Sequence, residues 1–477
     1  MIPAEWIQVI REGLATADRI ALVYFLALNS FYAFLLIVSI PELWRHWQVS
    51  EDEVLQRLLA SDALPPVSIL VPAYNEEVTI AASVLSFLSL KYPRLEVILV
   101  NDGSRDRTVD VLIKEFDLYQ VPPAYPRTIA TKPIRAVYRS RMHSRLIVID
   151  KDNGGKADSL NAALSAARHP FVLAVDADTL IESDALLRLA RPFVLGTHVA
   201  AVGGTIRVAN SCRVEMGRVV DARVSSEWLA GCQVVEYLRA FLFGRLAWNR
   251  LGGNLVISGA FGLFRRDYLL DIGGYLTGNV TEDMDLAVRL HRYLKERNIK
   301  AQMPFIPDPV AWTEVPSSIA VLARQRERWH RGLIGTMISH RKMLLNPRYG
   351  ATGMVAMPYF VFGELLAPVV EVMGYVLTIV GFLIGAISWQ FGLLFLAVAV
   401  GYGTLLSVWA VVLEEISFRK YRRRSDTLRL LGFAFIEGLG FRQMTVWFRL
   451  QAFWKYFRGV ESWGAMTRQG FANKKSE

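Results

Sequence analysis

A run of 21 residues without a charged side chain, Ile20–Ile40, constrains this chain more than any other feature. A helix rises about 1.5 Å per residue, so this run is long enough to cross a hydrocarbon core of about 30 Å. Arg19 and Glu42 flank it. We therefore predict a membrane-spanning helix here. Before it, residues 1–19 mix apolar and charged side chains, which predicts an amphipathic helix in the membrane interface.

Long apolar runs return near the end of the chain. Pro358–Ile387 and Trp389–Leu413 adjoin, which predicts two membrane helices joined by a tight turn. Glu364 and Glu371 interrupt the first run, and they either extend to the lipid headgroups or line a polar path through the membrane. A third stretch, Leu428–Tyr456, carries several charges. We predict that it re-enters or lies in the interface, although a crossing would place the C-terminal tail outside.

The loop after these helices is basic, with Arg419, Lys420 and Arg422–Arg424. By the positive-inside rule it lies in the cytoplasm. The middle of the chain, two spans earlier, is then cytoplasmic too, so we expect a multi-pass protein of the cell (inner or plasma) membrane. Cys212 and Cys232 fall in this middle region, where free thiols are expected.

The formal net charge of +10 suits phosphate-rich ligands and membrane lipid. The sequence has no zinc-finger spacing and no RNA-binding aromatic motif, so we expect no nucleic-acid partner. The patterns divide the chain into five regions. These are an N-terminal amphipathic and transmembrane helix (1–45), a cytoplasmic α/β domain (46–315), interfacial helices (316–350), a C-terminal transmembrane region (351–456) and a tail (457–477).

Short apolar strands alternate with helical segments in the α/β domain. This alternation predicts a mainly parallel sheet with helices on both faces. Ligands bind such sheets at the carboxyl ends of the strands. The expected strands are Val67–Val71, Glu96–Val100, Ile134–Tyr138 and Phe171–Val175, and the expected helices are Glu77–Leu90, Thr108–Leu118 and Lys156–Ala167.

Polar motifs follow the first two strands. Tyr74 and Glu76 lie in the segment Pro72–Glu77, and Asp102 lies in Val100–Ser104. Asp102 can accept the imide proton of a uracil ring, and Tyr74 can stack on that ring. Both segments also suit plain turns and helix caps, because Asn, Asp and Ser cap helices.

The next two motifs offer groups for phosphate and metal. Lys156 follows Gly154 and Gly155 at the expected start of a helix, where backbone can approach a ligand and anions are favoured. Asp176 and Asp178 close a strand. In an extended segment residues i and i+2 point the same way, so the two carboxylates can hold one Mg²⁺ or Mn²⁺. An ordinary acidic turn is the alternative.

Ser258 and Gly259 either line an acceptor channel or form a packed turn in the core. Glu282 and Asp283 follow Thr281 at the start of a predicted helix. Acidic residues are favourable at a helix N-terminus in any protein. Asp283 can also act as a general base, since a carboxylate within hydrogen-bond reach can take the proton of an acceptor hydroxyl.

Gln325, Arg328 and Trp329 are spaced i, i+3 and i+4, so they share one face of a helix. Arg328 can grip a diphosphate with its planar fork, and Trp329 can stack under a sugar ring. A basic amphipathic helix on anionic lipid would account for the charges in this segment. It would not account for Gln325 and Trp329 together.

In this order the motifs resemble the processive membrane glycosyltransferases of family 2, which include the synthases of cellulose, hyaluronan, chitin oligosaccharide and poly-N-acetylglucosamine. The resemblance covers about residues 65–335. Its motifs are Asn75-Glu76, Asp102-Gly103, Gly155-Lys156, Asp176-x-Asp178, Ser258-Gly259, Thr281-Glu282-Asp283 and Gln325-x-x-Arg328-Trp329. The last of these is the most specific.

The resemblance implies a GT-A catalytic domain over 46–315, joined to α-helical transmembrane segments. It implies a UDP-sugar donor, with UDP-N-acetylglucosamine or UDP-glucose as the best candidates, and inversion to a β-linkage. Mg²⁺ or Mn²⁺ would be bound by Asp178. The implied donor-binding residues are Tyr74, Glu76, Asp102, Lys156, Asp176 and Arg328, the acceptor-binding residues are Ser258, Gly259, Gln325 and Trp329, and the catalytic residues are Glu282 and the base Asp283.

Three functions follow. The first is a processive synthase that builds a β-linked polysaccharide and exports it; the others are a non-processive transferase acting on a lipid and an inactive membrane scaffold. Asn101 departs from the family, since many relatives have Asp there, and Leu118–Arg145 finds no place in the pattern. Trp463–Arg468 loosely resembles a gating segment of hyaluronan synthases. The sugar, the linkage, the chain length and the oligomeric state stay open.

Overall fold

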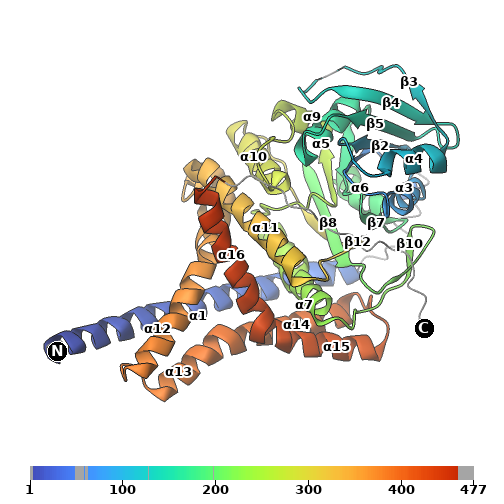
Figure 1. The fold of residues 1–477 in the computed structure, drawn as a ribbon. Helices are drawn as coiled ribbons and strands as arrows, with labels where there is room; N and C mark the ends of the chain where they lie inside the picture. Colours follow the sequence, from blue (N-terminus) through green and yellow to red (C-terminus); the bar gives the residue numbers. More distant parts are fainter. Residues whose placement is uncertain (1–3, 49–57, 60–62, 127, 197, 460–477) are drawn as a thin grey trace.

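The structure is a computed structural model, and it describes residues 4–48, 58–59, 63–126, 128–196 and 198–459. An α/β domain lies against a group of long helices that both ends of the chain supply (Figure 1). Most of the tail expected over 457–477, with its Trp463–Arg468 segment, lies outside the described residues.

The α/β domain is built on a ten-stranded sheet with the order β3-β4-β5-β2-β1-β6-β11-β8-β12-β7, and a separate pair is formed by β9 and β10. The strands are β1 (Val67–Ala73), β2 (Leu95–Asn101), β3 (Leu118–Val121), β4 (Ile134–Ser140), β5 (Leu146–Lys151), β6 (Phe171–Ala174), β7 (Thr179–Ile181), β8 (Ala201–Val208), β9 (Arg213–Glu215), β10 (Arg218–Asp221), β11 (Gly262–Arg265) and β12 (Phe305–Thr313).

The predicted parallel arrangement holds for β5, β2, β1 and β6 and again for β8 and β12. The other neighbours in the large sheet pair antiparallel, so the expectation of a mainly parallel sheet is wrong outside its centre. The strand expected at Ile134–Tyr138 illustrates the reason. It joins β5 through the short segment 141–145, whereas a parallel pair needs a long crossover.

The central strands are apolar on both faces because helices cover both. Ile69 of β1 packs in one core with residues of α3 and α4, and its neighbour Leu70 packs in a second core with residues of α5. Successive side chains of a strand point to opposite faces, which explains the split. The helices of this part are α3 (Ile80–Leu88), α4 (Thr108–Phe116), α5 (Lys156–Ala166), α6 (Ala185–Leu195), α7 (Trp228–Glu236), the π-helical η1 (Tyr237–Phe243), α8 (Gly244–Leu251), α9 (Arg266–Asp271), α10 (Glu282–Glu296) and α11 (Ile319–Ser339).

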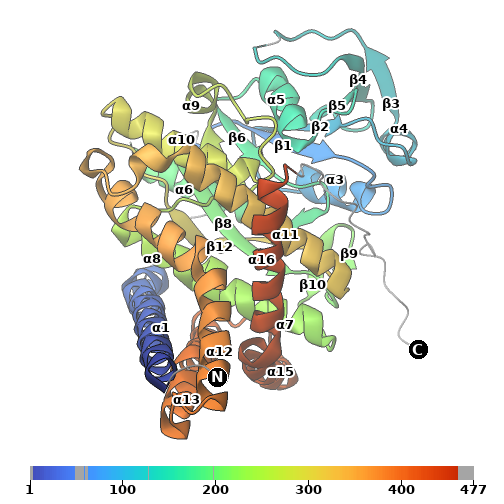
Figure 2. The same ribbon diagram turned by 60° about the vertical axis from the view of Figure 1, so that its left-hand side comes forward.

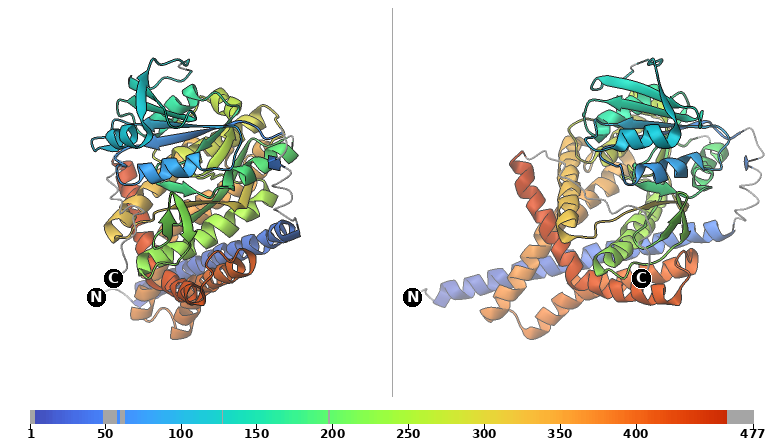
Figure 3. Two further views of the ribbon diagram at one scale, coloured as in Figure 1. Left: turned by 90° about the vertical axis from the view of Figure 1, so that its right-hand side faces the viewer. Right: turned by 45° about the vertical axis from the view of Figure 1, so that its right-hand side comes forward.

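The N-terminal helix α1 (Ala4–Gln48) is one helix of 45 residues. Its segment Gln8–Trp44 is long and apolar enough to cross a membrane. The amphipathic segment expected over residues 1–19 belongs to the same helix, because α1 continues without a break from Ala4 into the apolar run, and its place in the membrane interface stays a prediction. Figure 3 shows α1 passing along one side of the α/β domain and extending well beyond it.

The C-terminal helices follow the predicted hairpin. Trp389–Ser417 is the second described helix that passes the length and composition test for a membrane span, and Thr352–Leu365 with Ala367–Leu383 forms a third span if this pair, bent by 43°, counts as one. These apolar helices associate the protein with membrane. The helices are η5 (Tyr359–Leu365), α12 (Ala367–Leu383), α13 (Trp389–Leu396), η6 (Ala397–Gly401), α14 (Tyr402–Ser417), α15 (Arg424–Ile436), η7 (Glu437–Phe441) and α16 (Arg442–Phe457).

The charged stretch Leu428–Tyr456 forms two helices, α15 and α16, rather than one span. Between them Leu439 and Gly440 leave helical backbone angles. After this break α16 runs back along α11 (Figure 2), and Lys455 Nζ lies 2.6 Å from Glu327 Oε2. The helix that carries Gln325, Arg328 and Trp329 is thus held in place by the C-terminal region.

Ion pairs fasten the α/β domain to the helices. Arg207 of β8 donates to both carboxylate oxygens of Glu414 on α14, at 2.8 and 3.0 Å, and both side chains are buried. Lys420, just after α14, pairs with Glu182 at 2.8 Å. The domain is thus joined to the helices by one buried and one half-buried ion pair. Both cysteines are free, which confirms the expectation.

Candidate functional site

A cavity of about 460 Å³ opens beside the sheet and continues between the helices. Its walls combine segments that are far apart in the sequence, from α1, α8, α11, α12 and α16. Most of the predicted site residues meet here. The predicted residues that line it are Lys156, Asp176, Asp178, Ser258, Gly259, Glu282, Asp283, Gln325, Arg328 and Trp329.

Lys156, at the first position of α5, lies at the centre of the acidic end of this cavity. Its Nζ is 2.5 Å from Asp176 Oδ1 and 3.0 Å from Glu282 Oε1. Burial alone would lower the pKa of Lys156, but the charges of Asp176, Glu282 and Asp283 outweigh it and raise that pKa. Burial in turn raises the pKa of Glu282, and Lys156 opposes this change. Lys156 is therefore a fixed positive charge among carboxylates.

Asp283, in the first turn of α10, is held by two backbone groups. Gly259 N–H donates to Oδ2 at 2.9 Å, and Met284 N–H donates to Oδ1 at 2.8 Å. Glycine suits this close approach, because a Cβ at position 259 would lie 3.1 Å from Asp283 Cβ and 3.2 Å from Lys156 Nζ, so that these neighbours would have to shift. The glycine of the Ser258-Gly259 motif thus positions the carboxylate of Asp283.

Asp176 and Asp178 lie in a tight turn between β6 and β7. Thr179 N–H donates to the carbonyl of Asp176 at 3.1 Å, so the expectation of an extended segment here is wrong. The turn nevertheless brings both side chains to the cavity, with Asp178 only 3% exposed. Within the described ranges no group of three or more His, Cys, Asp or Glu residues is arranged for a metal ion. Two carboxylates still fit Mg²⁺ or Mn²⁺, which take further oxygen ligands from phosphate and water.

The face of α11 predicted from the spacing of Gln325, Arg328 and Trp329 is turned toward the cavity. The Oε1 atom of Gln325 is buried and has no hydrogen-bond partner among the residues that the structure describes. An unpaired buried oxygen costs free energy, so it suits a ligand that brings a donor. The Trp329 ring lies between Arg326, whose guanidinium is 4.3 Å from its centroid, and the ring of Phe241 at 6.1 Å.

The residues predicted at the ends of the first two strands lie outside the cavity lining. Tyr74 is 42% exposed. The Asp102 carboxylate accepts from Lys151 Nζ at 2.6 Å and from the N–H groups of Gly154 and Gly155 at 3.0 and 2.8 Å. Asp102 therefore anchors the glycine loop that leads to Lys156, and its contact with uracil stays a prediction.

The cavity ends among the membrane helices in a series of ion pairs. Arg449 and Arg442 of α16 pair with Glu364 and Glu371, at 3.3 and 3.1 Å. The two glutamates are seven positions apart in the sequence, and so are the two arginines. Two antiparallel segments therefore present matching charges. Glu371 is 2% exposed. These glutamates face inward, which favours the polar path over extension to the lipid headgroups.

Sequence reasoning missed a third wall of the cavity, formed by η1 and α8. Tyr237, Phe241 and Arg245 line it together with Glu236 at the end of α7. Glu236 Oε2 lies 2.6 Å from Arg326 on α11. These residues belong to no spaced motif. The mixture of charged and aromatic side chains within a short apolar segment was the one signal that could have drawn attention to them.

Comparisons with known proteins agree with this geometry. The family described as glycosyltransferase-like family 2 matches residues 131–332, and the family described as glycosyl transferase family 2 matches residues 68–124. The chain is 29% identical over 266 residues to a poly-β-1,6-N-acetyl-D-glucosamine synthase of Staphylococcus epidermidis, and 28% identical over 272 residues to that of Staphylococcus aureus strain COL. These matches cover 56% and 57% of this chain and 54% and 55% of the relatives, so the chain spans about half the length of each.

Among solved structures, the mannosyltransferase of Pyrobaculum calidifontis in complex with GDP-Man and Mn²⁺ is similar in fold, with a TM-score of 0.51 at 18% identity. The match covers 88% of this chain and 99% of that one. At this identity the likeness shows a shared fold, which is the GT-A fold that the motifs implied. Given the two family matches, the cavity and this fold, the chain belongs to glycosyltransferase family 2.

Proposed function

We propose that the protein is an inverting glycosyltransferase that adds sugar from a UDP-sugar to a growing β-linked polysaccharide. One observation carries this proposal: a single cavity joins the carboxylate of Asp283 to Asp176, Asp178 and Lys156, and then continues between the helices. The carboxylate of Asp283 suits a base, and Asp176, Asp178 and Lys156 suit a donor's diphosphate with its cation. The continuation suits an acceptor longer than one sugar.

In this reaction Asp283 takes the proton of the acceptor hydroxyl. The hydroxyl oxygen forms a bond to the anomeric carbon, the bond from that carbon to the diphosphate breaks, and the electron pair leaves with UDP. Attack on the face opposite to the leaving group inverts the configuration. The N–H groups of Gly259 and Met284 hold the carboxylate of Asp283 in one orientation, so the base is positioned before the acceptor arrives.

The diphosphate would lie between Lys156 and Arg328, which supply positive charge. Asp178, with Asp176, would hold Mg²⁺ or Mn²⁺, and the cation's chemistry is to neutralise the leaving diphosphate. The Mn²⁺ in the complex of the Pyrobaculum mannosyltransferase supports a divalent cation. We assign Tyr74, Glu76 and Asp102 to the nucleoside end of the donor.

The name of the staphylococcal relatives, poly-β-1,6-N-acetyl-D-glucosamine synthase, favours UDP-N-acetylglucosamine over UDP-glucose as the donor. Ser258, Gln325 and Trp329 would then bind the acceptor. We further propose that the protein crosses the membrane more than once and that its catalytic domain is cytoplasmic, because the basic residues Arg422–Arg424 follow α14.

A lipid acceptor is the second candidate. Leu28, Leu35 and Leu36 of α1 line the same cavity, so part of its wall is apolar and belongs to a helix suited to lipid. A non-processive transferase that glycosylates a lipid would use this wall. The two candidates share the chemistry at Asp283 and differ in the product.

The test uses the full chain in lipid nanodiscs with UDP-N-acetylglucosamine, UDP-glucose and UDP-glucuronate, with and without Mg²⁺ or Mn²⁺. We expect UDP release with one of the first two and a product that lengthens with time. Asp178→Asn should abolish the metal-dependent turnover while thermal unfolding stays close to wild type. Equal loss of turnover and stability would contradict the metal role. If all of the transferred sugar is extracted with the lipid fraction, the acceptor is a lipid. If none of the three donors gives UDP release, the proposal is overturned.

A further inference from the structure

Arginines line the cavity on several sides, and four of them have a carboxylate partner. Arg239, Arg326, Arg442 and Arg449 pair with Glu437, Glu236, Glu371 and Glu364 at distances between 2.6 and 3.3 Å. Arg245, on α8, differs. Among the described residues it has a ring contact, 4.8 Å from the centroid of Phe241, and no ion pair.

A guanidinium without a counter-ion is costly in a partly buried position. Burial lowers the pKa of Arg245 to about 10, and the nearby Asp283 and Tyr237 offset part of this change. Arg245 is therefore still charged near neutral pH. Among the residues that the structure describes, Arg245 is thus a cavity-lining cation without an ion pair, which suits a group that arrives with the substrate.

The position of Arg245 indicates which substrate brings that group. The guanidinium of Arg245 lies 4.8 Å from the centroid of the Phe241 ring, and that ring lies 6.1 Å from the ring of Trp329, which we assign to the acceptor. In the proposed reaction this is therefore the acceptor side.

The wall around Arg245 suits a sugar ring. Phe241 lies between Arg245 and Trp329, with its centroid 6.1 Å from that of Trp329 and 4.6 Å from that of Tyr237. Aromatic faces of this kind stack on the apolar faces of sugars. A ring placed on them would present a substituent to Arg245. The substituent must accept hydrogen bonds, because guanidinium has donors alone.

We propose that Arg245 recognises the acetamido carbonyl of an N-acetylated sugar at the end of the acceptor, and that it makes the enzyme prefer such acceptors. The proposal rests on the transferase function above. A carbonyl oxygen accepts hydrogen bonds from the N–H groups of the Arg245 guanidinium. A free amine in the same place would be an ammonium group, which the guanidinium repels. A hydroxyl would bind more weakly than the carbonyl.

The test compares three acceptors of equal length in nanodiscs: a β-linked N-acetylglucosamine oligomer, its fully de-N-acetylated form and a glucose oligomer. We expect wild-type kcat/KM to favour the acetylated oligomer over the amine by about tenfold or more, since a hydrogen bond to a charged group has this strength. Arg245→Met should bring the ratio close to one, mainly by raising KM for the acetylated acceptor. Arg245→Lys should retain part of the preference.

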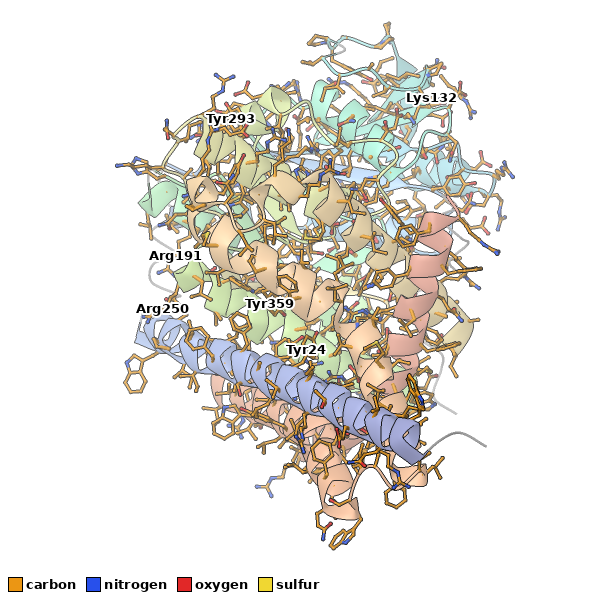
Figure 4. All side chains as sticks on the ribbon, turned by 90° about the vertical axis from the view of Figure 1, so that its left-hand side faces the viewer. Tyr24, Lys132, Arg191, Arg250, Tyr293 and Tyr359 are labelled. Carbon is orange, nitrogen blue, oxygen red and sulfur yellow. The ribbon has the colours of Figure 1, made fainter. Side chains whose placement is uncertain are left out.

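Arg250→Met is the matched control. Arg250 lies on the same helix, but it pairs with Glu42 outside the cavity, beside the C-terminal end of α1 (Figure 4). This variant should keep the wild-type ratio. An unchanged ratio in Arg245→Met, or a preference for a glucuronate-terminated oligomer, would overturn the proposal. The proposal would also be overturned if Arg245→Met changed the pH dependence of kcat and left the acceptor KM unchanged, because Arg245 would then act through Asp283.

Binding of the same oligomers, measured by calorimetry in the presence of UDP, gives a readout that does not need turnover. The proposal expects tighter binding of the acetylated oligomer in wild type and loss of that difference in Arg245→Met. A protein that shows this difference but transfers no sugar would contradict the proposed function alone. A protein that transfers sugar with no difference would contradict the role of Arg245 alone. Thermal unfolding of each variant verifies that it is folded, and Arg245→Gln replaces Arg245→Met if the latter is not.

Discussion

The two ends of the cavity differ in how their charges are balanced. At the inner end, among the helices, each glutamate faces one arginine, as in the pairs Glu364–Arg449 and Glu371–Arg442. At the outer end Asp176 and Glu282 pair with one lysine, Lys156, and Asp178 and Asp283 line the same cavity. Paired charges stabilise an arrangement of helices. An excess of one sign is costly without a ligand, which supports the divalent cation that we propose for this end.

The sharpest test of this contrast compares two aspartates of α10. Asp283→Asn should reduce sugar transfer by about 10²- to 10⁴-fold, since it removes the base, and should leave thermal unfolding unchanged. Asp285→Asn should lower the temperature of thermal unfolding and leave sugar transfer by the folded protein close to wild type. The Asp285 carboxylate is buried between Arg289 at 2.7 Å and His340 at 3.1 Å, so its loss should lower stability. Normal transfer by Asp283→Asn would contradict the role of Asp283 as the base, and absence of transfer in the wild type would favour the inactive scaffold.

The inner pairs can be tested by a double-mutant cycle at Glu371 and Arg442. Removal of one partner of a buried pair costs about 3–5 kcal/mol, and we expect the lower part of this range because the Arg442 side chain is 17% exposed. Glu371→Leu with Arg442→Met should cost less than the sum of the two, since no charge is left unpaired. Chemical unfolding in detergent measures all three variants. Additive losses would show that the pair is not coupled.

At the outer end, Gly259→Ala should separate position from chemistry. The added Cβ would lie 3.1 Å from Asp283 Cβ, so the base must shift by a few tenths of an ångström or more. We expect kcat to fall by about 10- to 100-fold with donor affinity close to wild type, because catalysis is sensitive to such displacements. Steady-state kinetics with varied UDP-sugar measures both constants. Wild-type kcat would contradict the role assigned to Gly259.

The smallest effect concerns a balanced pair away from the cavity. Burial raises the pKa of Glu96, but hydrogen bonds from Ser68 and Arg168 and the charge of Arg168 outweigh this and lower it below 4.5. A lowered pKa contributes stability that is present above pH 4.5 and is lost as the pH falls through the lowered value. Because Arg168 is 61% exposed, we expect about 1 kcal/mol. Unfolding of Glu96→Gln should lose this part of the acid dependence; an unchanged acid profile would contradict it.

The sequence predicted the parts of this molecule that depend on local pattern. Apolar runs located the helices that are long enough to cross a membrane, and strand-end motifs located Lys156 and Asp176, because parallel strands bring their carboxyl ends together. Strand direction at the sheet edges was not predictable in this way. An antiparallel strand such as β4 has the same apolar pattern as a parallel one, and the length of the connection decides.

The parts that depend on distant contacts escaped prediction. Asp102 was assigned to uracil, yet its carboxylate is occupied by Lys151 and by the glycine loop, contacts that no spacing in the sequence reveals. Arg245 belongs to no motif, and its interest comes from the lack of an ion pair among the described residues. Pairing and its absence are properties of the folded chain.

The 45 residues of α1 correspond to a rod of about 68 Å, more than twice the thickness of a hydrocarbon core of about 30 Å. Its apolar segment Gln8–Trp44 covers most of this length, and near the end of that segment Glu42 ties the helix to Arg250 of α8. Leu28, Leu35 and Leu36 of the same segment line the cavity. A change in bilayer thickness that tilts this rod would therefore move a wall of the cavity, so we expect sugar transfer to respond to lipid chain length.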